Sequence, residues 1–166
     1  MIQLLQSLLD RLNIIPGINY VALFNNQLQN AKEENVFFPA VYVEVYGGVQ
    51  YEAGLGDVQY GTTTLRFHIV NESPLQGSEM DIYSLKAKVN EYLQHYTTGE
   101  FQPLVRTGEE LDTNHDNLYI YKIDYQTRFA EVVYLDADYD TVTVDEIDVK
   151  YDMNDDGDEI KIDKII

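Results

Sequence analysis

Three segments of the chain alternate apolar and polar residues with a period of two, and this pattern limits the fold more than any other feature of the sequence. In AVYVEVY, the valines Val41, Val43 and Val45 fall on one face of an extended chain. Successive side chains of a strand point to opposite faces, so such a strand is covered by apolar neighbours on one side only. The same alternation recurs in residues 58–70 and 117–134. The sequence therefore predicts three long strands of one half-buried sheet.

Two other segments have the period of an amphipathic helix. The first ends before Pro16 and Gly17, and the second runs from a candidate N-cap at Ser78 to Gly99. The apolar stripes are formed by Ile2, Leu5, Leu8, Leu9 and Leu12 in the first helix and by Ile82, Leu85, Val89, Tyr92, Leu93 and Tyr96 in the second. We expect both stripes to pack on the same face of the sheet, since each needs an apolar partner.

These elements predict an α+β fold class: an antiparallel sheet of about four strands with two helices packed on one face, plus a C-terminal acidic β-hairpin. Residues 18–23 are expected to form a short strand. Residues 47–56 carry four glycines and are expected to be a long, flexible connection between two strands. We therefore divide the chain into an α+β core at residues 1–135 and a hairpin at residues 136–166.

The chain carries a formal net charge of −18, of which residues 136–166, with 12 acidic and three basic residues, account for −9. A surface this acidic repels phosphate backbones and anionic lipids, so we expect no tight binding to nucleic acid or to a membrane. No segment has the roughly 18 apolar residues of a spanning helix and no basic leader is present, from which we expect neither membrane insertion nor export.

The sequence contains no recognisable set of catalytic residues. It has no cysteine, and it contains no recognisable nucleophile or phosphate-binding motif. His68 lies beside Arg66 on the polar side of its strand and is expected at the surface. We therefore expect a protein without enzymatic activity and without a thiolate-bound metal.

The segment DMNDDG near the C-terminus has two interpretations. Asp152, Asn154, Asp156, Asp158 and Asp163 supply oxygen atoms at positions of an EF-hand calcium loop, with a glycine at the sixth position. However, the eighth position is acidic instead of apolar, and aspartate replaces the longer glutamate at the twelfth. The flanking residues alternate like strands, and Asp-Gly is a strong hairpin signal. The sequence favours a hairpin turn without a cofactor, and a calcium site is the alternative.

Several of the 14 tyrosines fall on strand faces opposite the aliphatic residues or beside the glycine-rich segment. Tyrosine combines apolar area with a polar tip and is favoured in protein–protein interfaces. Ordinary sheet packing explains the same placement equally well, because tyrosine is also common in strands. The predicted interface residues are Tyr42, Tyr46, Tyr51, Gly54, Gly56 and Tyr60.

The order of the elements and two local patterns resemble the tail terminator, or tail completion, proteins of long-tailed bacteriophages. One pattern is the Pro-Ala-Val entry into a strand at residues 39–41. The other is Arg106 followed by the Asp-x-x-His-Asp-Asn-Leu turn from Asp112 to Leu118. The resemblance covers about residues 1–135 and does not extend to the hairpin.

This resemblance implies a non-enzymatic virion protein at the head–tail junction, present in the host cytoplasm during assembly. Proteins of the family form a ring, here expected to be hexameric, that caps the tail tube and stops its growth. The implied partners are further copies of the chain, the tail tube protein and the head connector protein. Two alternatives stay open: a calcium-binding structural or adhesive module, and another head–tail connector (neck) protein.

Overall fold

The computed structural model of the chain describes residues 1–26, 37–54, 57–72, 79–112, 118–132, 150–152 and 159–161. The chain divides into two compact units, Met1–Val133 and Tyr134–Ile166. The first unit contains two helices and a five-stranded sheet, and the second contains a two-stranded sheet. The α+β class predicted from the sequence is confirmed, but the main sheet has five strands where about four were expected.

The main sheet has the strand order β1-β2-β3-β5-β4. Its strands are β1 (Tyr20–Leu23), β2 (Ala40–Ala53), β3 (Val58–Glu72), β4 (Val105–Asp112) and β5 (Leu118–Val132). β1 pairs with β2 in parallel, and the other neighbours pair antiparallel. The central strand β3 pairs with β5 over its full length of 15 residues. These two strands form the longest continuous ladder of the sheet.

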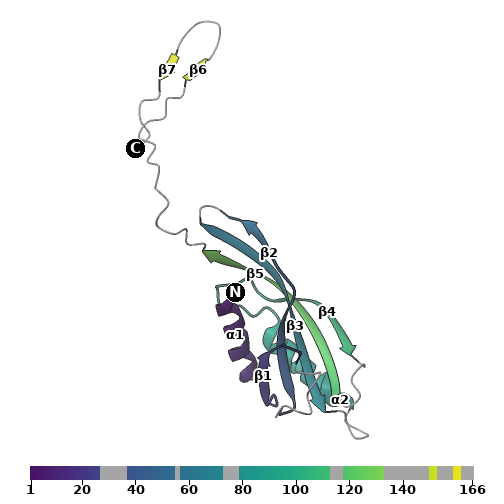
Figure 1. The fold of residues 1–166 in the computed structure, drawn as a ribbon. Helices are drawn as coiled ribbons and strands as arrows, with labels where there is room; N and C mark the ends of the chain where they lie inside the picture. The colour runs from purple at the N-terminus through teal and green to yellow at the C-terminus, as the bar shows by residue number, and fades with distance from the viewer. Residues whose placement is uncertain are drawn as a thin grey trace. The chain divides into compact units, whose positions relative to one another are not determined.

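Helices α1 (Ile2–Asn13) and α2 (Glu79–Leu93) pack on one face of this sheet, as Figure 1 shows. The main buried contacts come from Leu4, Leu8, Leu12, Ile82, Leu85, Val89 and Leu93 of the helices and from Val41, Val43, Leu65, Phe67, Ile69 and Ile123 of the strands. The predicted placement of both helices is therefore confirmed. The buried stripe of α1 includes Leu4, whereas Ile2 is 84% exposed.

The second helix is shorter than the sequence predicted. It ends at Leu93, well before Gly99, because His95 adopts a positive φ of 63°. The N–H of His95 then donates to the carbonyl of Leu104, the residue directly before β4. Tyr96 still packs against the core, but it does so from this connection. The helical spacing of apolar residues therefore extends beyond the last residue of the helix, and for this reason the sequence predicted a helix that is too long.

The prediction of a flexible connection at residues 47–56 is wrong for its described part. β2 continues through Gly47 and Gly48 to Ala53 and stays paired with β3. The two glycines have φ values of 73° and 81° and form a bulge in the ladder, a conformation that glycine adopts at little steric cost. Glycine is typical of bulges and of loops alike, so the sequence pattern did not separate them. Residues 55–56 lie outside the described residues.

Three strands continue past the helices as a ribbon, which is visible at the upper end of the sheet in Figure 1. We call this ribbon the extension; it consists of Val49–Ala53, Val58–Thr63 and Thr127–Val132. Side chains fill the space over Gly61, since a Cβ atom placed there would lie 2.6 Å from the ring of Phe129. The extension is therefore a packed continuation of the sheet.

The second unit contains two short strands at the position of the expected C-terminal hairpin. β6 (Lys150–Asp152) and β7 (Glu159–Lys161) pair antiparallel, with Tyr151 opposite Ile160. The turn between them, residues 153–158, lies outside the described residues. The choice between a plain turn and a calcium loop therefore stays a prediction.

Candidate assembly interface

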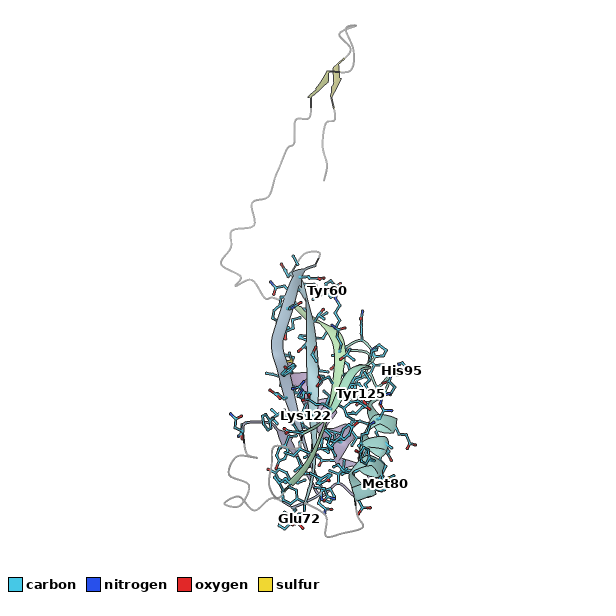
Figure 2. All side chains as sticks on the ribbon, turned by 90° about the vertical axis from the view of Figure 1, so that its right-hand side faces the viewer. Tyr60, Glu72, Met80, His95, Lys122 and Tyr125 are labelled. Carbon is cyan, nitrogen blue, oxygen red and sulfur yellow. The ribbon has the colours of Figure 1, made fainter. Side chains whose placement is uncertain are left out.

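The sheet face opposite the helices carries a set of charged side chains, and we call it the open face. Alternation along each strand separates these side chains from the buried aliphatic residues, so Lys122 and Tyr125, labelled in Figure 2, belong to opposite faces of β5. No helix within the described residues covers the open face. Its ionisable residues include Glu44 on β2, Arg66 and His68 on β3, Glu110 and Asp112 on β4, and Lys122, Asp124 and Arg128 on β5.

A bidentate ion pair joins Arg66 to Asp124 across β3 and β5. Nε and Nη2 of Arg66 donate to the two carboxylate oxygens of Asp124, each at 2.8 Å. The two side chains are only 15% and 19% exposed, so water screens this pair less than a surface pair. The hydrogen bonds to Asp124 raise the pKa of Arg66 further above its usual value. Arg66 also lies over the ring of Tyr46, 3.7 Å from its centroid.

A second cation extends this ion pair into a network. The Nζ of Lys122 lies 2.8 Å from Oδ2 of Asp112 and 3.3 Å from Oε1 of Glu110. Burial disfavours the charged ammonium, but the hydrogen bonds to these carboxylates outweigh burial and raise the pKa of Lys122. Glu110 is in turn 3.9 Å from Arg66. The network therefore ties β3, β4 and β5 together on the open face.

His68 is buried beneath an aromatic ring, which corrects the expectation that it lies at the surface. It is 4% exposed, and its ring stacks on that of Phe24 with centroids 4.2 Å apart. Its Nε2 lies 2.7 Å from Oε2 of Glu44, and no described residue hydrogen-bonds to its Nδ1. Burial lowers the pKa of His68 and outweighs the opposite effect of Glu44.

Three of the four predicted interface tyrosines lie at the surface. Tyr42 is fully buried, because the rings of Tyr20 and Phe24 pack against it. It therefore offers no exposed area to a partner, although it lies on the strand face that the alternation predicted. Of these four predicted residues, the ones with exposed side chains are Tyr46, Tyr51 and Tyr60.

The predicted interface glycine Gly54 shapes the hairpin. Its N–H donates to the carbonyl of Val58 at 2.8 Å, which closes the end of the hairpin. A Cβ atom at this position would lie 2.6 Å from the same carbonyl oxygen, so no larger residue fits without a shift. Gly56 lies outside the described residues.

The exposed tyrosines of the extension are held by residues distant in the sequence. On the open face, the guanidinium of Arg128 lies 4.6 Å from the ring centroid of Tyr60. On the opposite face, the Tyr51 hydroxyl donates to Glu131 at 3.0 Å, and the other oxygen of Glu131 accepts from the α-amino group of Met1 at 2.7 Å. Sequence analysis missed these partners, because no local pattern relates residues this far apart in the chain.

The described side chains contain no group of three or more His, Asp or Glu residues that could hold a metal ion. The candidate calcium ligands have no described side chains; they are Asp152, Asn154, Asp156, Asp158 and Asp163. Within the described residues, no helix is long and apolar enough to cross a membrane.

The sequence matches no protein-family model, and no curated protein matches it. The site itself therefore has to support any functional proposal. Its two main features are the ion-paired open face and the extension with its exposed tyrosines.

Replacing Asp124 with asparagine should lower the free energy of unfolding by about 2–3 kcal/mol, because the charge of Arg66 loses its partner in a partly buried place. The matched variant is Glu52→Gln, which removes the carboxylate 2.9 Å from Arg128 at a position where Glu52 is 69% exposed. We expect an effect below about 1 kcal/mol there. Urea denaturation measures both, and equal losses would contradict a special role for the Arg66–Asp124 pair.

The buried imidazole should make stability depend on pH. Burial lowers the pKa of His68 in the folded state below the ordinary value of 6.5, so the unfolded state takes up the proton first. The free energy of unfolding should therefore fall as the pH drops through and below about 6.5. His68→Gln should remove this part of the dependence, and His95→Gln should retain it. Denaturation curves at a series of pH values test this, and an unchanged slope in His68→Gln would point to another group.

Proposed function

We propose that this protein is a structural component of a phage tail, which forms a ring, caps the tail tube and joins it to the head connector. The observation that carries the proposal is the extension, a three-stranded ribbon with exposed tyrosines that reaches past both helices. Figure 2 shows Tyr60 near the far end of this ribbon, away from Met80 and His95. Such an element suits contact with a neighbouring subunit or with the end of a tube, because it carries contact residues away from the core.

The open face supports a preformed contact surface. Tyr46 stacks with Arg66, and Tyr60 stacks with Arg128. Tyrosine and arginine are the residue types most enriched, with tryptophan, in the hot spots of protein interfaces. Because the rings are already held within the chain, association would immobilise fewer free side chains. This arrangement favours binding by a rigid surface.

The partly buried cations, each paired with a carboxylate, support a structural role rather than catalysis. Arg66, Lys86 and Lys122 each have a carboxylate oxygen at 2.7–2.8 Å. A neutralised and fixed cation holds strands and helices together, whereas an active site directs perturbed polar groups toward a substrate. The ion pairs are therefore better suited to stiffening the subunit than to chemistry.

The acidic charge supports a ring through which DNA passes. Binding of DNA is driven largely by protein cations that neutralise phosphates and release counterions. A chain with a net charge of −18 offers few such cations, so DNA would move through an acidic ring without adhering. The proposed partners are further copies of the chain, six by family resemblance, together with the tail tube protein and the head connector protein.

The proposal predicts that the purified protein forms rings and that Tyr60→Ser weakens them. Tyr60 is 38% exposed and Tyr83, on α2, is 41% exposed, so Tyr83→Ser removes the same group from a different surface as a matched control. We expect Tyr60→Ser to raise the protein concentration needed for rings at least about tenfold, as for a hot-spot residue. Light scattering and negative-stain images measure the mass and shape of the particles.

Two results would count against the proposal in different ways. A wild-type protein that stays a single chain at every concentration would contradict ring formation. Equal effects of Tyr60→Ser and Tyr83→Ser would leave ring formation standing but would remove the extension from the contact.

A further inference from the structure

A buried imidazole on the open face is covered by an aromatic ring from outside its own strand. The ring of Phe24 stacks on that of His68, with the two planes 9° from parallel. The Nε2 of His68 lies 2.7 Å from Oε2 of Glu44, so a neutral imidazole with its proton on Nε2 donates to this carboxylate. Nδ1 then carries no proton, and it has no hydrogen-bond partner within the described residues.

A second proton on this imidazole has to go to the buried Nδ1. The new N–H finds no acceptor among the described residues. The ring of Phe24 offers none either, because the nearly parallel stacking turns the edge of the imidazole away from the face of that ring. A buried donor without an acceptor is costly, and more so when it carries a charge. The covered position therefore opposes protonation of His68.

The charged groups that face the imidazole come from three strands. They are Glu44 on β2, Arg66 on β3 and Lys122, which lies opposite His68 on β5; Tyr42 is the neighbour of His68 on β2. Arg66 and Lys122 repel a positive charge here, although their own carboxylate partners weaken this effect. Glu44 attracts the charge, but its side chain is 30% exposed, so water screens part of the attraction. The covered position therefore suits a neutral imidazole better than a protonated one.

Phe24 is the part of this cover that can open at the lowest cost. It directly follows β1, a strand of four residues at one end of the strand order, and its N–H donates to the carbonyl of Val43 at 2.8 Å. His68 itself lies in the 15-residue strand β3, which is paired on both sides. Short elements with few partners open locally at a lower free energy than the whole domain unfolds.

We propose that Phe24 and His68 form an acid-sensitive latch, in which protonation of His68 releases Phe24 and the end of β1 from the open face. Release lets water reach Nδ1, while β2, β3 and β5 stay paired. The ring of Phe24 also packs edge-on against Tyr42, so release uncovers part of a buried apolar cluster. The buried members of this cluster are Ala40, Tyr42, Val70 and Ile120. As the pH falls, the open face presents this apolar surface more often. The latch does not rest on the proposed ring.

Residue-resolved hydrogen exchange tests the latch, because the N–H of Phe24 reports its release. At about pH 7.5 this amide should be at least about tenfold less protected than that of Phe67, which is buried in the middle of β3. Between about pH 7.5 and about pH 5, the protection of Phe24, corrected for the chemical exchange rate, should fall about tenfold. This size follows from one linked proton, since each pH unit below the ordinary histidine pKa of 6.5 favours the open state by up to about tenfold.

His68→Gln should abolish this fall, because an amide does not take up the proton, and His95→Gln is the matched control that should retain it. The NMR signals of the His68 imidazole give a second readout that needs no variant: the fall should level off at the pH where this imidazole titrates in the folded chain. Protection of Phe24 that does not change with pH would overturn the latch. Protection equal to that of Phe67 at every pH would also overturn it, because Phe24 would then be released only by global unfolding. So would a fall that persists in His68→Gln.

Discussion

The uninterrupted pairing of β3 with β5 is the constraint on which the rest of the structure depends. Val58–Glu72 lies opposite residues 118–132 without a break in register. One half of this ladder buries Leu65 and Phe67 against the helices, and the other half forms the extension. Because the same two strands run through both parts, the core fixes the direction of the extension. The exposed tyrosine Tyr60 is therefore held at a defined place relative to the helices.

The fold was predictable where the pattern is local. The alternation in AVYVEVY correctly separated Val41 and Val43 from Tyr42, because side-chain direction in a strand depends only on neighbouring residues. The burial of Tyr42 was not predictable, since Phe24 reaches it from a different element. The bulge at residues 47–48 was missed for a related reason: glycines suit a loop as well as a bulge, and only the ladder with β3 decides between them.

The site was less predictable than the fold, because its interactions join distant residues. Composition indicated an acidic protein with few cations, but it did not indicate that Arg66 would find Asp124 or that Glu131 would bind the amino group of Met1. These pairs require the register of β3 and β5. These pairs also assign a role to the charged residues. The cations of the open face neutralise carboxylates of the same subunit and stiffen the sheet. Burial of His68 likewise depends on a distant residue, because the ring of Phe24 stacks on its imidazole.

Hydrogen exchange of the amides in β3 tests most directly whether the extension is a rigid part of the sheet. Residues 58–63 are paired on one side with β2 and on the other with β5. Their amides that donate to these neighbours should exchange slowly, on a scale similar to those of residues 65–69 in the core, because opening them requires breaking the same ladder. Exchange of residues 58–63 at the rate of an unstructured peptide would contradict the account, and it would restore the flexible connection that the glycines alone suggest.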